Sequence, residues 1–438
     1  MRSKQINDLR VDNLSHEGRG VAQLDNGKTI FIDNALPTET VDALITVNKS
    51  SYSEGIACNI KVKSDLRETP ECEHFGTCGG CSLQHMNNQV QINTKRKSLL
   101  EQIEKFGKTT PVNVAKTIEG PLWNYRNKAR LSCKYVDKKG RVLLGFREQQ
   151  SRYVADLKSC NILNVWFSRN ITTLAELVES LSLKREIPQI EISCGDDIKA
   201  IIIRHLSPFI DSDIEKIKAF SITHDLHIYT QSKGPKTIIK IAPEDHKPYL
   251  DYYLEDYDVR LKFHPSDFTQ INPQINRKMI ARALEWLDLQ KDDVILDLYC
   301  GIGNFSLPIA RKQVKSVIGV EGCEQMVARA SRNAKDNGIT NAQFIAADLN
   351  ENLPIKIIKQ KPNKMLLDPS RAGAKAICEN LAIMPDKIVY VSCNIATLSR
   401  DIDYLCNKHG YILEKTSLID MFPHTKHAES IALLQKSS

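Results

Sequence analysis

The chain has 438 residues, of which 42% are hydrophobic and 26% are charged, and its formal net charge is +7. This composition is typical of a globular protein with two or three domains, and it excludes a largely disordered chain. No run of about 18 apolar residues and no secretory signal is recognisable, so we expect a cytoplasmic protein without a membrane span. In that compartment its twelve cysteines favour metal binding or catalysis over a disulfide framework.

The first part of the chain, residues 1–63, has the pattern of a small all-β domain. Its segment KTIFIDNALPTETVDALITV alternates apolar and polar residues, and Gly18, Gly20 and Pro37 mark turns. Alternation of this kind predicts strands with one buried face. A barrel of five short strands fits this length.

The middle part, residues 64–265, opens with a group of cysteines and then mixes strand-like and helix-like segments. Residues 101–170 contain 14 Lys and Arg against 6 Asp and Glu, so most of the surplus positive charge lies there. This stretch is either a solvated sheet face or a surface that tracks phosphates and stacks bases, and charge alone does not decide. The basic residues and the aromatic residues between them are Arg126, Lys128, Arg130, Lys138, Lys139, Arg141, Arg147 and Arg152, with Trp123, Tyr125, Tyr135 and Phe146.

The final part, residues 266–438, alternates predicted helices and strands. A helical pattern over 276–289 leads to an apolar run at 293–300, which is followed by a glycine turn and another helix. Four more predicted strands follow at 315–321, 342–348, 363–370 and 387–393. Such regular alternation predicts a doubly wound, mostly parallel sheet.

Polar residues stand in or just after these five predicted strands, where open α/β sheets bind their ligands. They are Asp297, Glu321, Asp348, Asp368 and Cys393. Glycines after the first strand let a cofactor approach the backbone, and an acidic residue after the second can hold ribose hydroxyls. The third glycine of the dinucleotide fingerprint is missing, so a nucleoside without phosphates, such as S-adenosylmethionine, fits better. Each acid alone is more often a helix cap, but five together favour a cofactor site.

Five motifs, FTQIN, DLYCGIGNFSLPIA, LLDPSRAG, YVSCNIATLSRD and MFPHTKHAES, resemble those of the RNA 5-methyluridine methyltransferases. LSHEGRGVA and NALPTETV are similar to the family's TRAM domain, and CEHFGTCGGCSLQHM is similar to its iron–sulfur segment. The resemblance implies an OB-like TRAM barrel at 1–63, a central α+β domain with an iron–sulfur cluster at 64–265, and a Rossmann-like S-adenosylmethionine-dependent methyltransferase domain at 266–438. This order resembles the bacterial members that methylate uridine 1939 of 23S rRNA, whereas the tRNA-modifying members typically lack the first two features.

The resemblance also assigns roles to residues. C5 of uracil is a poor nucleophile until a thiolate adds to C6, and Cys393 matches that nucleophile. Its pKa would have to be lowered by a helix start or a cation. Glu429 matches the base that removes the C5 proton, Asp368 matches the residue that orients the uracil, and Arg371 could hold that carboxylate or the thiolate. The implied cofactor contacts are Gln270, Tyr299, Asn304, Glu321, Asp348 and Asp368.

Three cysteines of the middle part, Cys72, Cys78 and Cys81, have C-x5-C-x2-C spacing on a glycine-rich segment. Three close thiolates and one distant cysteine can hold a [4Fe–4S] cluster, and Cys160 matches the fourth ligand by resemblance. Zinc is the alternative, with His85 as the fourth ligand. The spacing differs from that of radical S-adenosylmethionine enzymes, so a structural cluster is the better interpretation. The cysteines predicted to be core residues are Cys58, Cys133, Cys194, Cys300, Cys323, Cys378 and Cys406.

Other interpretations stay open at this point. Cys393 could be a packing residue, and cytosine-C5 methylation would use the same thiolate step. Amino-methylation is disfavoured because Arg371 stands where a stacking aromatic is expected. A non-catalytic iron–sulfur RNA-binding protein would explain the barrel and the basic stretch, but not Cys393 with Glu429. The substrate could also be another rRNA uridine or a tRNA. We expect 23S rRNA as the partner, no obligate protein partner and a monomer.

Overall fold

The chain folds into two compact units. The first contains the described part of Met1–Glu101 with Arg147–Tyr153 and Phe422–Ala428, and the second contains the other described residues. None of the described helices combines the length and the apolar character of a membrane-crossing segment. The computed structural model describes residues 4–244, 248–351 and 353–437.

A six-stranded sheet forms the core of the first unit, in the order β1-β5-β6-β4-β3-β2. β4 and β6 are parallel and the other neighbours are antiparallel. β1 also contacts β3, so the sheet curls back on itself as a barrel would. The strands are β1 (Gln5–Arg10), β2 (Asn13–Leu14), β3 (Gly20–Gln23), β4 (Thr29–Asp33), β5 (Thr40–Asn48) and β6 (Tyr52–Val62).

The predicted alternation is confirmed in this sheet. Ile30 and Ile32 of β4 are fully buried in a core with Leu9 and Val41, whereas Phe31 between them is not. There is one strand more than the five expected, because the two-residue strand β2 pairs with β3 across a tight turn. That turn needs Gly18, whose φ is +75° and whose missing Cβ would lie 2.6 Å from the side chain of Leu83.

Two sheets of the second unit are formed by strands between residues 128 and 263. The larger has the order β13-β12-β11-β10-β8-β9, and α3 and α4 pack on it; the smaller is the hairpin β14-β15. The strands are β8 (Lys128–Val136), β9 (Arg141–Gly145), β10 (Gln189–Cys194), β11 (Lys199–Arg204), β12 (Leu226–Gln231), β13 (Ile238–Ala242), β14 (Leu250–Leu254) and β15 (Val259–Phe263). The helices are α2 (Val165–Arg169), α3 (Ile171–Ser180) and α4 (Asp211–His224), and α1 (Asn88–Gly107) precedes them in the chain.

The last part of the chain forms seven strands of an eight-stranded sheet, whose order is β18-β17-β16-β19-β20-β22-β21-β7, and β7 joins its edge from earlier in the chain. The first five strands in this order, β18, β17, β16, β19 and β20, are all parallel, which confirms the predicted doubly wound sheet. β22 runs antiparallel to both of its neighbours. The strands are β7 (Asn113–Val114), β16 (Val294–Leu298), β17 (Ser316–Glu321), β18 (Ala342–Ala346), β19 (Lys364–Leu367), β20 (Lys387–Ser392), β21 (Tyr411–Ile419) and β22 (Glu429–Lys436).

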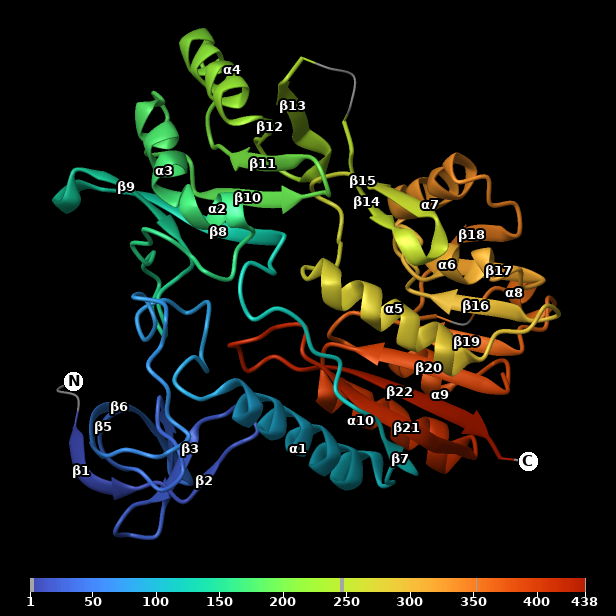
Figure 1. Cartoon of the computed structure of the whole chain (residues 1–438), viewed down its shortest axis with the longest axis horizontal. Helices are drawn as coiled ribbons and strands as arrows, with labels where there is room; N and C mark the ends of the chain where they lie inside the picture. Colours follow the sequence, from blue (N-terminus) through green and yellow to red (C-terminus); the bar gives the residue numbers. More distant parts are fainter. Residues whose placement is uncertain (1–3, 245–247, 352, 438) are drawn as a thin grey trace. The chain divides into compact units, whose positions relative to one another are not determined.

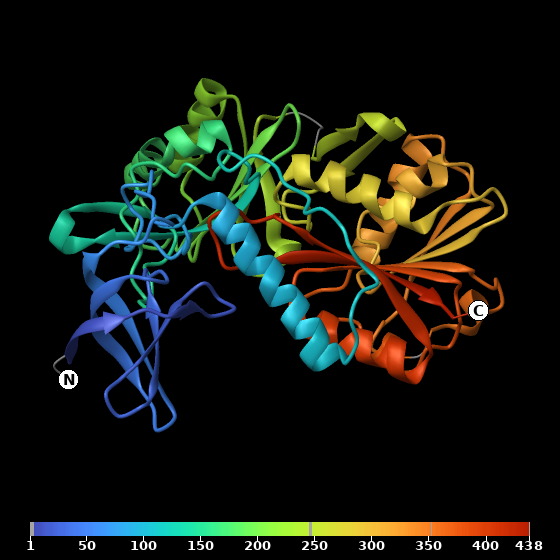
Figure 2. The same ribbon diagram turned by 60° about the horizontal axis from the view of Figure 1, so that its bottom comes forward.

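Helices cover both faces of this sheet. Figures 1 and 2 show α5 and α7 on one side and α10 on the other. The helices are α5 (Pro273–Leu287), α6 (Ser306–Arg311), α7 (Glu324–Asp336), α8 (Ile355–Ile358), α9 (Lys375–Glu379) and α10 (Ile395–Asp403). Strand order reverses direction between β16 and β19, and sheets of this kind bind ligands at the carboxyl ends of the strands at such a switch point.

Candidate active site

Two of the predicted site residues, Cys393 and Glu429, are placed side by side by the register of β20 and β22. Ser392, the last residue of β20, pairs with Ser430, and Glu429 is the first residue of β22. Cys393 follows Ser392 directly and precedes Asn394, whose side chain caps α10 by accepting a hydrogen bond from the Ala396 N–H at 3.1 Å. The thiol therefore stands between a strand end and a helix start, as the sequence predicted.

Electrostatics couple this thiol to three charged groups. Burial, then the carboxylates of Glu429 and Asp368, raise the pKa of Cys393 to about 11, and the Arg371 guanidinium opposes them. Burial and Asp368 hold the pKa of Glu429 well above its ordinary value, again against Arg371. The expected lowering of the thiol pKa is therefore not met in the protein without ligands, because burial of the thiol, and then the two acids, outweigh the single cation.

Asp368 lies at the end of β19 and is partly exposed. Protein atoms around its carboxyl nevertheless desolvate it, and this burial, with Asp297 nearby, raises its pKa to about 7. The side-chain amide of Gln270 donates to its Oδ2 at 3.5 Å. The arrangement therefore brings together Gln270, Asp368, Cys393 and Glu429, which come from four separate stretches of the chain.

The loop after Asp368 is clamped to α10. Arg371, whose side chain is exposed, accepts a hydrogen bond at its carbonyl from the Asn394 side chain at 2.9 Å. The Ala374 N–H donates to buried Asp401, which also accepts from the Tyr390 hydroxyl at 2.6 Å. These contacts fix the loop that carries Asp368 and Arg371 against the helix that follows Cys393.

Sequence reasoning missed most of this clamp. The Asn394 cap could have been found, because an asparagine stands directly before a helical pattern. Nothing in the spacing indicates Asp401 or Tyr390. Gly373 has φ +76°, and a Cβ there would lie 2.5 Å from the Arg400 guanidinium and 2.7 Å from the Asp401 carboxylate. A glycine is therefore required at this close approach.

The turn after β16 has the features of a cofactor site. Tyr299, Gly301 and Gly303 all have positive φ. Glu321, at the end of β17, accepts hydrogen bonds from the Gly301 N–H at 3.3 Å and the Cys323 N–H at 3.0 Å. Glu321 thus lies at the end of the second parallel strand, where the sequence predicted an acidic residue, and a carboxylate at this position is suited to ribose hydroxyls.

Asp297 provides a further polar group at this turn. Its Oδ2 accepts a hydrogen bond from the Ser306 hydroxyl, whereas its buried Oδ1 has no hydrogen-bond partner among the described residues. Burial raises its pKa to about 7. A buried acceptor without a donor, next to a glycine-rich turn, fits a bound polar ligand such as a nucleoside.

The remaining predicted cofactor residues surround the same turn. Asn304 exchanges two hydrogen bonds of 2.9 Å with Asn276 and accepts one of 2.8 Å from the Tyr252 hydroxyl, so its amide is held in one orientation. Asp348 is exposed and accepts from the amide of Asn350. Burial raises the pKa of the Tyr299 phenol, and charges that include those of Asp348 and Glu321 raise it further.

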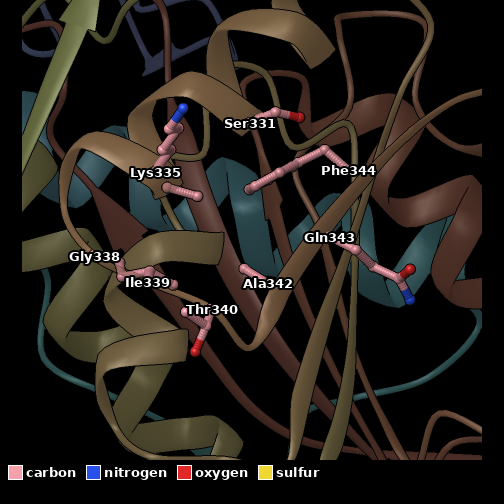
Figure 3. Close-up of a pocket in the computed structure, with 9 residues that line it drawn as sticks. Ser331, Lys335, Gly338, Ile339, Thr340, Ala342, Gln343 and Phe344 are labelled. Atoms are coloured by element: carbon pink, nitrogen blue, oxygen red, sulfur yellow. The ribbon is translucent and has the colours of Figure 1, made fainter.

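A separate pocket lies between α7 and β18, at the edge of the sheet (Figure 3). Its volume is about 280 Å³, and Ser331, Lys335, Thr340, Gln343 and Phe344 are among the residues that line it. None of the predicted site residues lines this pocket. It therefore does not change where the candidate active site is placed.

The predicted metal ligands Cys72, Cys78 and Cys81 belong to the first unit and follow β6, whereas Cys160 belongs to the second unit. The Gly80 N–H donates to the Cys78 sulfur at 3.4 Å. Burial raises the pKa of the Cys78 thiol, which Gly80 lowers and the neighbouring Cys72 raises. Within the described ranges, no three His, Cys, Asp or Glu side chains are gathered closely enough to hold a metal ion.

His85, the alternative zinc ligand, is buried near these cysteines in the sequence. Both of its ring nitrogens lack a hydrogen-bond partner in the described part of the chain. Burial lowers its pKa to about 3, so the ring is neutral at physiological pH. A neutral, buried and unsatisfied imidazole has the chemistry of a metal ligand.

The cysteines predicted to be core residues divide into two groups. Cys133, Cys194, Cys300 and Cys378 are buried, and Cys406 is partly buried. The prediction is wrong for the remaining two, which are exposed: Cys58 lies within β6, and Cys323 is the residue before α7. A small apolar residue that is exposed on a strand or at a helix start resembles a core residue in the sequence.

The basic stretch is less uniform than its composition indicates. Lys128 is not a surface cation, since its ammonium donates to the carbonyls of Pro265 and Asp267, and burial lowers its pKa to about 8. Arg130 is exposed but paired with Glu191 at 3.0 Å. Lys138 is exposed. Part of the surplus charge therefore supports the fold, and part remains available to phosphates.

Comparison with protein families gives two matches. Residues 87–437 match the model of tRNA (Uracil-5-)-methyltransferase. Residues 5–58 match the TRAM domain. Residues 59–86, which contain Cys72, Cys78 and Cys81, lie between the two matched ranges.

Several curated bacterial proteins are similar over nearly their full length. The chain is 44% identical over 430 residues to the 23S rRNA (uracil(1939)-C(5))-methyltransferase RlmD of Legionella pneumophila strain Corby, which covers 98% of this chain and 96% of that protein. It is 46% identical over 435 residues to the protein of the same name from Hahella chejuensis, with the same coverage.

One solved structure is similar over the whole chain. It is that of Pyrococcus abyssi tRNA (uracil-54, C5)-methyltransferase in complex with S-adenosyl-L-homocysteine, with a TM-score of 0.74 and 23% identity. The match covers 97% of this chain and 99% of that one. At this identity the similarity shows a common fold.

Proposed function

This chain belongs to the tRNA (Uracil-5-)-methyltransferase family, and on that premise we propose that it transfers a methyl group from S-adenosylmethionine to C5 of a uridine in 23S rRNA, at position 1939. The names of the full-length relatives support this substrate. The observation that carries the proposal is the placement of Cys393 beside Glu429, at the ends of two adjacent strands.

The first step needs the Cys393 thiolate. It adds to C6 of the uracil, and the electron pair of the C5–C6 bond moves to form an enolate, which makes C5 nucleophilic. Asp368 and Gln270 form one hydrogen-bonded pair beside the thiol and orient the uracil edge. Bound S-adenosylmethionine supplies an electrophilic methyl group on a sulfonium.

The second step needs a base. After C5 has been methylated, its proton must leave before the bond between C6 and the Cys393 sulfur can break. Glu429 is buried beside Cys393, and its raised pKa makes its carboxylate a stronger base than an exposed one. We assign it the removal of this proton, after which the thiolate is expelled and the double bond re-forms.

We place the cofactor-binding site at the turn after β16. We assign the ribose hydroxyls to Glu321 and the remaining contacts to Gln270, Tyr299, Asn304, Asp348 and Asp368. The positive φ values of the turn and the unsatisfied oxygen of Asp297 support this assignment. Glycines in that turn leave room for a ligand to approach the backbone.

Purified full-length protein, S-adenosylmethionine and an unmodified 23S rRNA fragment test the proposal. We expect 5-methyluridine at position 1939 when the product is mapped at single-nucleotide resolution. The control is the same fragment with cytidine at that position. Methylation at another uridine, or of tRNA alone, would contradict the proposed substrate, and methylated cytidine in the control would contradict the reaction.

We further propose that Cys72, Cys78 and Cys81 hold a [4Fe–4S] cluster with Cys160, which matches the fourth ligand of the family. Three thiols on one glycine-rich segment and the Gly80 N–H directed at a sulfur support the donor set. The unsatisfied ring of His85 favours a second candidate, a zinc ion bound by the same three thiols and His85. Either group would have a structural role.

Metal analysis after anaerobic purification decides between the two. The cluster predicts brown protein with about four iron atoms per chain, and Cys160→Ser should lose or destabilise that iron. The zinc candidate predicts stoichiometric zinc without iron, which His85→Ala but not Cys160→Ser should remove. Protein with neither metal would contradict both.

We also propose a division of labour along the chain. A stacked uracil must be turned out of its RNA before C6 can meet a thiol, which requires a few kcal/mol. The TRAM barrel at 1–63 and the central domain at 64–265 would supply this energy by binding RNA, and the domain at 266–438 would carry out the reaction. Deleting residues 1–63 should then weaken RNA binding and slow methylation with little change in S-adenosylmethionine affinity.

A further inference from the structure

The loop that immediately precedes Glu429 is built into the first unit rather than the second. The chain leaves β21 at Ile419, and β22 begins at Glu429. Between them, Phe422–Ala428 packs with Met1–Glu101. One peptide bond therefore joins this loop, residues 422–428, to the residue assigned as the base.

Helix α1 holds the loop from one direction. The Gln91 side chain is almost fully buried, and its Oε1 accepts a hydrogen bond from the His424 N–H at 2.9 Å. Its Nε2 donates to the Met86 carbonyl at 3.0 Å. One helix turn later, the Lys95 ammonium donates to the Phe422 carbonyl at 3.1 Å. Gln91 thus ties the loop to the end of the cysteine segment, defined here as residues 72–86.

The cysteine segment holds the loop from the other direction. The N–H groups of Ser82 and Leu83 both donate to the His424 carbonyl, at 2.9 and 3.0 Å. The Ser82 hydroxyl accepts from the Lys426 N–H at 3.1 Å. Ser82 directly follows Cys81, so these bonds begin one residue after a proposed metal ligand.

The backbone at His424 shows that these contacts determine the conformation. Its φ is +65°, in the left-handed region that residues other than glycine rarely adopt. A residue stays in such a conformation only where its surroundings fix it. Here the N–H of His424 and its carbonyl are both engaged, by Gln91 on one side and by Ser82 and Leu83 on the other.

We propose that Gln91 and Ser82 are positioning residues for Glu429: they join the cysteine segment to the loop 422–428, and so set the place of the base that removes the C5 proton. The inference rests on the proposed function, because it takes Glu429 as that base. It adds a role for the cysteine segment in the second half of the reaction, which is distinct from RNA binding.

Displacement of Glu429 should affect only the second of the two halves of the reaction. Thiolate addition and methyl transfer do not use Glu429, whereas proton removal and release do. A displaced base therefore leaves a methylated RNA joined to Cys393, which persists when the protein is denatured. A general loss of structure would instead reduce formation of this adduct as well as turnover.

The test uses full-length protein, an ordinary uridine-containing 23S rRNA fragment and S-adenosylmethionine labelled in the methyl group. We compare Gln91→Leu with Gln89→Leu, a matched control on the same helix, because Gln89 is exposed and its side-chain amide donates a hydrogen bond to Asn93 of the same helix at 3.1 Å. For Gln91→Leu we expect turnover to fall about tenfold and the labelled protein–RNA adduct to accumulate. Gln89→Leu should match the wild type, and S-adenosylmethionine affinity should stay unchanged in both.

The reference is Glu429→Gln, which should accumulate the same adduct. If it does and Gln91→Leu does not, the positioning role is wrong while the proposed function stands. If Glu429→Gln forms no adduct, the assignment of the base fails, and the positioning role fails with it. Should Gln91→Leu not bind S-adenosylmethionine, Ser82→Ala decides, with the same adduct expected at about two- to threefold the wild-type level.

Discussion

The site around Cys393 and the cysteine segment at 72–86 differ in how their reactive groups are held in place. The first lies at the ends of parallel and antiparallel strands, where sheet register places Glu429 next to Cys393. The second lies between β6 and α1, outside both elements, and is held by hydrogen bonds such as that from the Gly80 N–H to Cys78. In one region the backbone fixes the reactive groups, and in the other the side chains and turns do.

The difference has a physical consequence. A strand end is fixed by the whole ladder of the sheet, so the thiol and its neighbours stay in place without ligands. A segment without such a ladder has fewer constraints of its own, and a bound metal can supply them. We therefore expect the strand-end site to keep its arrangement without a ligand, and the cysteine segment to lose its arrangement when its metal is removed.

The largest effect is expected at the strand end itself. Cys393→Ala removes the nucleophile and should lower methyl transfer by about four orders of magnitude or more. S-adenosylmethionine binding should remain near that of the wild type, because the proposed cofactor residues come from other segments of the chain. Single-turnover transfer of labelled methyl measures the first, and calorimetry measures the second. Substantial turnover by the purified variant would show that the strand end does not supply the nucleophile.

The pH dependence of thiol addition should be the next largest effect. With a thiol pKa of about 11, thiolate is the minor form at neutral pH, and its fraction rises about tenfold per pH unit. The rate of adduct formation with 5-fluorouridine RNA should therefore rise with pH from about 6 to about 9, less steeply near pH 7, where Asp368 becomes charged.

Arg371→Gln sharpens this prediction. Loss of the cation that opposes the two acids raises the thiol pKa further, so addition should slow by about tenfold for each unit of that rise, at every pH in this range. Lys375→Gln is the matched control, since Lys375 is exposed and pairs with Glu379 at 3.9 Å. A plateau in the wild-type profile below about pH 8 would mean that the folded site lowers the thiol pKa.

A smaller effect is expected from the clamp on the loop after Asp368. Gly373→Ala places a methyl group against Arg400 and Asp401 and strains a positive φ, so it should displace Asp368 and Arg371 and lower kcat by about ten- to a hundredfold. The control is Gly338→Ala, which has the same sign of φ but meets nothing within 4 Å. Equal losses of activity in the two variants would show that backbone strain, and not the clamp, is responsible.

The smallest effect is expected away from both regions, on the basic surface of the central domain. Arg130→Glu with Lys138→Glu should weaken RNA binding and reduce its dependence on salt, since about two fewer phosphates are neutralised. Binding measured at several salt concentrations gives this slope. Lys128 is not a suitable target, because its buried ammonium holds backbone carbonyls. An unchanged slope would exclude these two residues from the RNA-binding surface.

The sequence predicted the regular part of the molecule well, for identifiable reasons. The five parallel strands, of which all but the edge strand β18 are largely buried, alternate with helices. The residues at their ends could be considered together because a parallel sheet brings carboxyl ends to one edge. Asp368 and Cys393 are the clearest cases, since each directly follows a strand. The resemblance then added Glu429, which precedes no glycine turn and has no distinguishing local pattern.

What the sequence could not predict depends on tertiary contacts. The thiol pKa is raised rather than lowered, because the folded chain buries Cys393 and brings Glu429 and Asp368 to it from other parts of the chain. The buried position of Lys128 is invisible in a count of charges. Likewise, the spacing predicted Cys72, Cys78 and Cys81 as metal ligands, but a segment outside the strands and helices gives no register from which to derive their geometry.

The most direct test of the account is the position of the covalent bond to the substrate. With 5-fluorouridine at position 1939, no proton is present on C5 to be removed, so the enzyme should remain attached to the RNA. After nuclease and protease digestion, mass spectrometry should find the methylated nucleotide on the peptide that contains Cys393, and no adduct with Cys393→Ala. Absence of a denaturation-resistant complex, or attachment at any other residue, would contradict the central claim that Cys393 is the nucleophile.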